Sequence, residues 1–144
     1  MTRLLTQLGG ARFTIGVSLA LIAMGGAERR VGIAALIANG TSHLAVQILK
    51  RVVARPRPCD PCGVPLALVA LPDSLSFPSG HAAASAALAA SLTFWHPLLG
   101  VVVLPLAAGV AATRVTLRVH FVTDVLAGSA LGLAGAIAAQ SLLY

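Results

Sequence analysis

The sequence predicts an all-α integral membrane protein, a single domain over residues 1–144 that forms a helical bundle of about five transmembrane helices. Hydrophobic residues make up 58% of the chain and charged residues only 10%, whereas soluble domains are about one quarter charged. Apolar residues occur in runs close to the roughly 20 residues that a helix needs to cross a bilayer. The basic residues, which give a net charge of +6, lie in short clusters between these runs. This distribution favours a membrane over nucleic acid as the partner.

Five apolar runs are the candidate spanning helices, and the shorter ones must include flanking residues to cross. They cover approximately Phe13–Ala27, Val31–Leu49, His81–Trp95, Pro97–Thr113 and Phe121–Tyr144. The first run follows Arg3 and Arg12, so it could alternatively be a secretory signal peptide, whose removal would leave one helix fewer. In the last run, Gly128 and Gly132 form a small-xxx-small pair of the kind that lets membrane helices approach closely.

The segment between the second and third runs, residues 51–77, is rich in proline. Its apolar part, Val64–Leu71, is too short to cross a bilayer, and we expect a re-entrant or interfacial loop. Cys59 and Cys62 also lie here, and without a second cysteine pair they cannot complete a zinc site. A disulfide and two free thiols both remain open. The four acidic residues are scattered along the chain, so we expect no metal and no cofactor.

The ionisable residues near the ends of the runs fall on one side of the predicted membrane. Following the chain back and forth across the bilayer brings together Lys50, Arg57, Ser79-Gly80-His81, Arg114, His120 and Asp124. Ionisable groups at membrane depth are costly, so such a collection indicates a functional site.

Each cluster suggests a particular chemistry. Lys50 and Arg57 would share a helix face if the helix continued, and two cations could then converge on one anion, such as a phosphate. Arg51 and Arg55 are expected to contact only anionic lipid headgroups.

The second cluster has the form of a helix start. Ser79 is placed to cap a helix, Gly80 lets a ligand approach the backbone, and His81 could donate a proton to a leaving group. A helix start without catalytic function is the alternative for this tetrapeptide, Pro78-Ser79-Gly80-His81.

The third cluster pairs a histidine with a carboxylate. His120 and Asp124 are spaced i, i+4, so the carboxylate can hold one ring nitrogen's proton and leave the other nitrogen free to attack phosphorus. Arg114 can stabilise the charge on a transferring phosphoryl group. A purely structural His-Asp pair is the alternative.

Together the three clusters resemble the signature of the phosphatidic acid phosphatase type 2 superfamily, which is K-x6-RP, then PSGH, then SR-x5-H-x3-D. This chain has Lys50-x6-Arg57-Pro58, then Pro78-Ser79-Gly80-His81, then Thr113-Arg114-x5-His120-x3-Asp124. The one departure within the signature is Thr113, which replaces serine and keeps the hydroxyl. The resemblance covers about residues 44–133.

This resemblance implies a membrane lipid phosphatase that needs no metal. By it, His120 is the nucleophile that forms a phosphohistidine, Asp124 orients it, and His81 protonates the leaving group. The phosphate would be bound by the residues that match the remaining positions, Lys50, Arg57, Ser79, Gly80 and Arg114. Bacterial relatives suggest undecaprenyl diphosphate, phosphatidate, phosphatidylglycerol phosphate or a polyprenyl phosphosugar as substrate.

Several further expectations accompany this interpretation. The partners are the lipid phosphate substrate and membrane lipids, and the location is the cell (inner) membrane with the site on the external face. Arg118, where relatives often carry a small residue, could favour a diphosphate headgroup. A lipid phosphotransferase using the same site is a close alternative, and a non-enzymatic small membrane transporter or channel is a more distant one.

Overall fold

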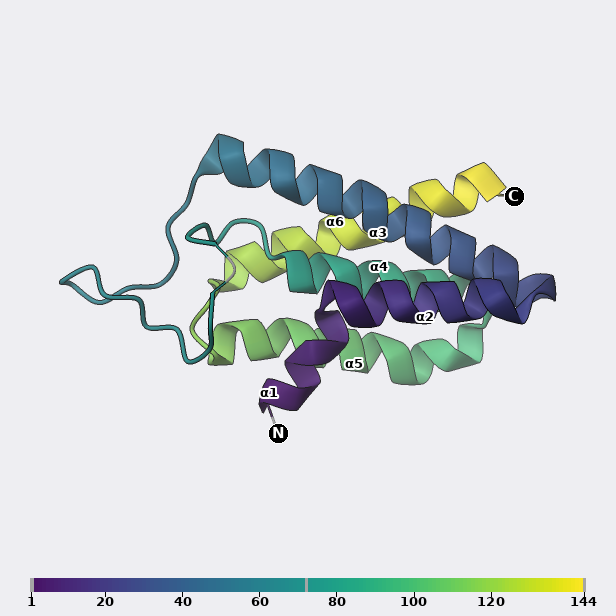
Figure 1. The fold of residues 1–144 in the computed structure, drawn as a ribbon, viewed down its shortest axis with the longest axis horizontal. Helices are drawn as coiled ribbons and strands as arrows, with labels where there is room; N and C mark the ends of the chain where they lie inside the picture. Colours follow the sequence, from purple (N-terminus) through teal and green to yellow (C-terminus); the bar gives the residue numbers. More distant parts are fainter. Residues whose placement is uncertain (1, 72, 144) are drawn as a thin grey trace.

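The chain folds into a bundle of long helices, as the computed structural model of residues 2–71 and 73–143 shows (Figure 1). The elements in order are α1 (Thr2–Leu5), η1 (Thr6–Gly9), α2 (Ala11–Met24), α3 (Gly26–Val53), α4 (Gly80–Trp95), α5 (Pro97–Thr116) and α6 (Val122–Leu143). Each of the five predicted apolar runs corresponds to one long helix, which confirms the all-α fold class. By length and composition α3, α5 and α6 can each cross a membrane. The segments α1–η1 and α2, which meet at a bend of 54°, make a fourth crossing if they count as one span.

Helix α3 begins earlier and ends later than the apolar run predicted. Residues 28–30 were expected between two helices, but only Gly25 separates α2 from α3, and its φ of 77° is a conformation that favours glycine. At its other end α3 continues past Leu49 to Val53. It stops at Ala54, which has a left-handed φ of 48° and whose N–H donates to the Lys50 carbonyl at 2.9 Å. The apolar run therefore marks only the middle of this helix.

Close contact between α4 and α6 is the feature of the bundle that positions the site. A Cβ added at Gly128 would overlap the carbonyl oxygen of Ser79, and one at Gly132 would overlap that of Ala83. The small-residue pair therefore lets the two backbones touch, as predicted. Alanines continue this close packing in the core, namely Ala34, Ala38, Ala87, Ala90, Ala136 and Ala139. The N-terminal ends of α4 and α6 consequently lie next to each other.

The connection between α3 and α4 extends beyond the helix ends at one end of the bundle (Figure 1). It runs outward and back, with isolated bridges between Pro56 and Leu75 and between Cys59 and Pro65. Leu68 accepts a hydrogen bond at its carbonyl from the side chain of Arg3 at 3.0 Å, which fastens this loop to the N-terminal segment. Both Cys59 and Cys62 are exposed free thiols.

Candidate active site

The residues of the three sequence motifs lie at one end of the bundle, as their parity along the chain predicted. This end is formed by the C-terminal ends of α3 and α5 and the N-terminal ends of α4 and α6, beside the 54–79 loop (Figure 1). A backbone hydrogen bond joins two of the motifs, because the Ser79 N–H donates to the Asp124 carbonyl at 2.9 Å. The polar groups here are mostly buried: Asp124 is fully buried and His120 is 4% exposed.

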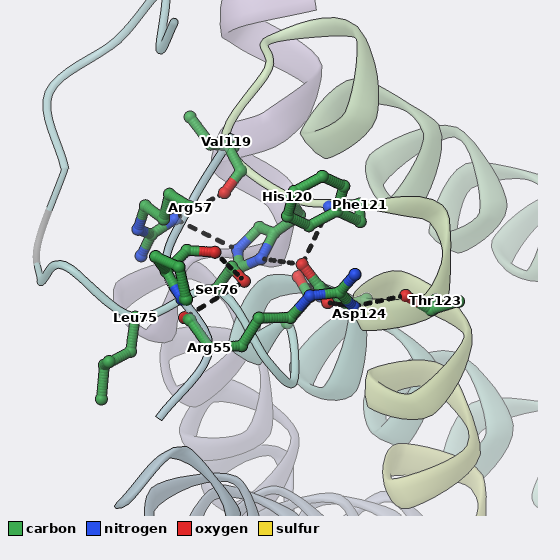
Figure 2. A network of polar contacts seen from close by, with 12 residues as sticks. Arg55, Arg57, Leu75, Ser76, Val119, His120, Phe121, Thr123 and Asp124 are labelled. Atoms are coloured by element: carbon green, nitrogen blue, oxygen red, sulfur yellow. Dashed lines mark hydrogen bonds and ion pairs between the residues drawn. The ribbon is translucent and has the colours of Figure 1, made fainter. Parts of the chain in front are cut away.

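His120 and Asp124 form the centre of this cluster. His120 precedes α6, and Asp124 lies in the first turn of that helix, where its Oδ2 accepts the Phe121 N–H at 2.8 Å. The same Oδ2 lies 3.6 Å from His120 Nδ1, in the range of an ion pair but longer than a hydrogen bond (Figure 2). Asp124 thus faces the Nδ1 side of the imidazole and leaves Nε2 on the other side.

The imidazole of His120 is held in its neutral form. Burial lowers the pKa of His120 to about 3, and the charges of Arg57 and Arg114 act in the same direction. Arg57 is the nearer of these two cations, with its Nη1 3.5 Å from His120 Nε2. A neutral ring retains a lone pair on one nitrogen, which a nucleophile needs.

Lys50 and Arg57 converge on a carboxylate, Asp73, that the sequence analysis did not identify as part of the site. Lys50 Nζ lies 2.7 Å from Asp73 Oδ2, and Arg57 Nη2 lies 3.0 Å from Asp73 Oδ1. Burial alone would raise the pKa of Asp73, but the hydrogen bonds from the two cations outweigh it and keep that pKa below its ordinary value. An acidic residue in the loop between two cationic motifs was the signal that could have revealed this contact.

Arg57 reaches the site by a different route from the one expected. The helix ends at Val53, so the condition for a shared helical face is not met and Arg57 lies outside the helix that carries Lys50. Instead Arg57 lies in the loop and is fixed by several contacts. Its Nη1 donates to the Val119 carbonyl and its Nε to the Asp73 carbonyl, each at 2.9 Å.

The PSGH segment forms the N-terminus of α4. Ser79 is the N-cap residue, and its hydroxyl accepts the Ala82 N–H at 3.5 Å. A Cβ added at Gly80 would meet only Val46, at 3.8 Å, so packing within the described chain does not require a glycine there. The Ser79 N–H donates to the Asp124 carbonyl, so the PSGH segment lies beside the stretch of chain that carries His120.

Arg114 is buried at the end of α5 and contacts the N-terminal segment. Its Nη1 donates to the Thr6 hydroxyl at 2.8 Å, a contact for which the sequence offers no signal. Its Nε is buried and has no hydrogen-bond partner among the described residues. An unpaired buried donor of this kind is available to an anionic ligand.

Arg55 contacts Asp124, so the expectation that it touches only lipid headgroups is wrong. Its Nη1 donates to Asp124 Oδ1 at 3.1 Å and to the Thr123 hydroxyl at 2.8 Å (Figure 2). Its guanidinium carbon lies 4.2 Å from the centre of the Phe121 ring. The chain leaves helical geometry at Ala54, so Arg55 no longer follows the exposed face of α3 that carries Arg51.

A cavity between α2, α3 and α4 extends to this end of the bundle. It has a volume of about 280 Å³ and reaches Gly80. Apolar residues line most of it, and its polar lining residues are Thr14, Asn39, Ser42 and His43. A groove of this composition beside the PSGH segment suits a ligand with both a polar and an apolar part.

The fold and the site together define an integral membrane protein with a buried histidine and arginine centre, and sequence comparison identifies its family. The sequence profile of the PAP2 superfamily matches residues 31–143, a range that contains all three motifs. The chain belongs to the PAP2 superfamily. Among the described residues no three His, Cys, Asp or Glu side chains are grouped as a metal site would require.

Two sequence relatives carry the name of one phosphatase. Decaprenylphosphoryl-5-phosphoribose phosphatase of Mycolicibacterium smegmatis is 38% identical over 105 residues, which cover 71% of this chain and 54% of the relative. The protein of the same name from Mycobacterium tuberculosis is 39% identical over 94 residues, 63% of this chain and 49% of the relative. The chain thus spans about half the length of the curated relatives it matches.

Solved structures show the same fold. The transmembrane PAP2-type phosphatidylglycerolphosphate phosphatase of Bacillus subtilis has a TM-score of 0.78 at 28% identity, over 98% of this chain and 74% of that one. Aquifex aeolicus LpxE has a TM-score of 0.82 at 21% identity, over 97% of this chain and 83% of that one.

Proposed function

We propose that this chain is a membrane lipid phosphatase that works through a phosphohistidine intermediate on His120. The observation that carries the proposal is that the three motifs, with the imidazoles of His81 and His120 and the cations of Lys50, Arg57 and Arg114, meet at one end of a membrane bundle. There Arg57 Nη1 lies 3.5 Å from His120 Nε2, and the Ser79 N–H donates to the Asp124 carbonyl at 2.9 Å. Two imidazoles allow one group to attack phosphorus and the other to manage the proton of the leaving group. The cations offset the charge of the phosphoryl group between them.

The attacking atom in this proposal is His120 Nε2. Asp124 lies on the Nδ1 side, 3.6 Å away, so we assign the ring proton to Nδ1 and the lone pair to Nε2. Attack by Nε2 forms a nitrogen–phosphorus bond and breaks the bond from phosphorus to the lipid oxygen. His81 gives that oxygen a proton. Water then attacks phosphorus, His81 takes the water's proton, and breaking of the nitrogen–phosphorus bond releases phosphate and neutral His120.

The phosphate-binding groups follow from the same arrangement. Arg57 lies beside Nε2, and the unpaired Nε of Arg114 offers a further donor. Ser79 contributes its hydroxyl and Gly80 its backbone N–H, at the positive end of the α4 dipole. These cations and dipoles provide the transition-state stabilisation that a metal provides elsewhere, so the proposed mechanism uses neither metal nor cofactor.

The substrate class follows from the relatives and from the cavity. A phosphate on a polyprenyl phosphosugar is our first candidate, because the relatives named for such a substrate are 38–39% identical to this chain. The cavity beside Gly80 would take part of the lipid chain. Phosphatidylglycerol phosphate, phosphatidate and undecaprenyl diphosphate complete the panel. Arg29 and Arg30 lie at the opposite end of α3, which supports a cytoplasmic location for that end and an external site in the inner membrane.

Phosphate release by detergent-purified protein tests this proposal. We expect release from at least one lipid of the panel with a chelator present and without an added alcohol acceptor. His120→Ala should lower the rate by at least about a thousand-fold, as loss of a nucleophile does. His96→Ala is the matched control, because His96 pairs with Glu28 at the far end of the bundle.

The alternatives predict other results. A phosphotransferase would need the alcohol, and a transporter or channel would tolerate His120→Ala. Acid quenching during turnover should trap an acid-labile phosphoprotein in the wild type and none in His120→Ala. A chelator-sensitive rate, or a phosphoprotein that survives in His120→Ala, would rule out the mechanism.

A further inference from the structure

We propose that Arg55 is a positioning residue, which holds the Asp124 carboxylate against His120 without itself binding phosphate. The inference rests on the proposed function and adds a residue outside the family signature. It assigns different tasks to the two arginines of Arg55-Pro56-Arg57-Pro58. Arg57 contacts the phosphate, whereas Arg55 contacts Asp124 on the Nδ1 side of His120, away from the attacking nitrogen.

The buried carboxylate of Asp124 needs a compensating positive charge. Its side chain is fully buried, and a buried carboxylate is costly unless a cation or several hydrogen bonds compensate it. The imidazole beside it is neutral, so it supplies no compensating charge. Among the described residues Arg55 is the arginine or lysine that forms an ion pair with Asp124, at 3.1 Å. Arg55 therefore supplies the positive charge that keeps this carboxylate in place.

Arg55 is held by further contacts. Its other contacts are the Thr123 hydroxyl at 2.8 Å and the face of the Phe121 ring at 4.2 Å. These partners belong to residues 121–124, the segment that directly follows His120 and starts α6 (Figure 2). The contacts thus fix the 54–79 loop to the short stretch of chain that carries the nucleophile.

The two oxygens of the Asp124 carboxylate have different partners. Asp124 Oδ1 accepts from Arg55, while Oδ2 accepts the Phe121 N–H and faces His120 Nδ1. Arg55 therefore reaches the imidazole only through the carboxylate, on the side away from Nε2. Arg57 lies on the Nε2 side and contacts Asp73 as well. A phosphoryl group on Nε2 would consequently meet Arg57 and not Arg55.

The expected effect is on the chemical step. The ring gains positive charge when Nε2 bonds to phosphorus, and a correctly placed Asp124 stabilises that charge through Nδ1–H. Without Arg55 the carboxylate keeps, among the described residues, the Phe121 N–H as its hydrogen-bond donor. The arginine side chain is 38% exposed, so water weakens the ion pair, and we expect a loss of about tenfold in kcat. Substrate binding should be little affected.

The test compares Arg55→Ala with Arg51→Ala as the matched control. Arg51 is an exposed arginine near the same end of α3, and its substitution removes the same charge. The measurements are kcat, KM, the inhibition constant of inorganic phosphate, and the rate of phosphoprotein formation after acid quenching. For Arg55→Ala we expect kcat and phosphoprotein formation to fall about tenfold, with KM and the phosphate inhibition constant within about twofold of wild type. Arg55→Lys should recover part of the loss, and Arg51→Ala should match the wild type.

Each other outcome overturns the inference. An unchanged kcat in Arg55→Ala shows that Arg55 has no positioning role, and a parallel rise in the phosphate inhibition constant shows that it binds phosphate. An equal loss in Arg51→Ala shows a general effect of surface charge. If Arg55→Ala does not fold, Arg55→Lys and Thr123→Val decide, since both should lower kcat without changing phosphate inhibition. A wild-type protein that releases no phosphate from any lipid refutes the proposed function instead, so the two failures are distinguishable.

Discussion

Asp73→Asn removes the carboxylate charge that Lys50 and Arg57 share in the structure. These two cations belong to the motif assigned to phosphate binding, yet Asp73 occupies them at 2.7 and 3.0 Å. A phosphate that takes the same cations has to displace this carboxylate. Asparagine keeps the shape of the side chain but gives up the charge. We therefore expect the variant to bind phosphate more tightly.

The magnitude follows from the exposure of the three side chains. Asp73 is 40% exposed, while the side chains of Lys50 and Arg57 are 9% and 4% exposed. Each pair thus lies between a surface ion pair and a buried one, and water screens the carboxylate, so each contributes about 0.5–1 kcal/mol. Loss of both changes phosphate affinity by about 1–2 kcal/mol, roughly a 5- to 30-fold decrease in the dissociation constant.

The assay is thermal unfolding of the detergent-purified protein during titration with inorganic phosphate. Without phosphate, Asp73→Asn should unfold at a lower temperature than the wild type, because two buried cations lose their counter-charge. Added phosphate should then raise the unfolding temperature at lower concentrations than in the wild type. Competitive inhibition of phosphate release gives an independent measure of the same affinity.

Asp60→Asn is the matched control for this experiment. Asp60 lies in the same loop, and its Oδ1 accepts two backbone N–H groups, from Cys62 and Val64, which the asparagine oxygen can also do. It should leave phosphate affinity unchanged. Equal or weaker phosphate binding by Asp73→Asn would refute the reasoning, because it would mean that Asp73 arranges the two cations for phosphate rather than competing with it.

Three further predictions concern packing, pH and backbone strain. Gly128→Ala places a methyl group on the Ser79 carbonyl and should cost about 1–3 kcal/mol of stability together with activity, measured by thermal unfolding and phosphate release. Gly16→Ala, whose Cβ would meet nothing within 4 Å, should retain both. The pKa of His120 is lowered from 6.5 to about 3, so the unfolded chain binds more protons in that interval and stability falls as the pH drops through it. His120→Asn should therefore lose less stability than the wild type between about pH 7 and about pH 4.5, as unfolding temperatures at the two pH values will show. Arg118 has a left-handed φ of 56°, so Arg118→Gly should raise stability by about 1 kcal/mol. If the preference between monophosphate and diphosphate lipids stays unchanged in that variant, the idea that Arg118 selects the headgroup is wrong.

The helices could be predicted because a bilayer leaves the backbone little choice. Polar main-chain groups in lipid must pair within the segment, so each long apolar run implies a helix. Hydropathy does not report where a helix stops. The end of α3 depends on Ala54, whose left-handed conformation no composition rule singles out, and four residues beyond Leu49 are therefore helical. Arg57 lies outside the helix for the same reason.

In the site, contacts between residues near in sequence could be predicted, and contacts between distant residues could not. His120 and Asp124 are close in sequence, so their proximity could be predicted, although His120 lies just before α6 and not on its face. The contacts that sequence reasoning missed join residues far apart in the chain: Arg55 and Asp124 are separated by 69 positions, and Thr6 and Arg114 by 108. Such contacts depend on the path of a loop and on the bend before α2, and neither leaves a periodic pattern. The repeated Arg-Pro was the one feature of the sequence that pointed to Arg55.

The hydrogen bond from the Ser79 N–H to the Asp124 carbonyl ties the main chains of two motifs together. With Gly128 seated on the Ser79 carbonyl, the spacing between the stretches that carry His81 and His120 is fixed by backbone rather than by side chains. Exchanges of side chains elsewhere in the site should then leave the His81 and His120 rings in the same relative position. New lipid specificities could be engineered by changing side chains around the site while keeping the close contact between α4 and α6.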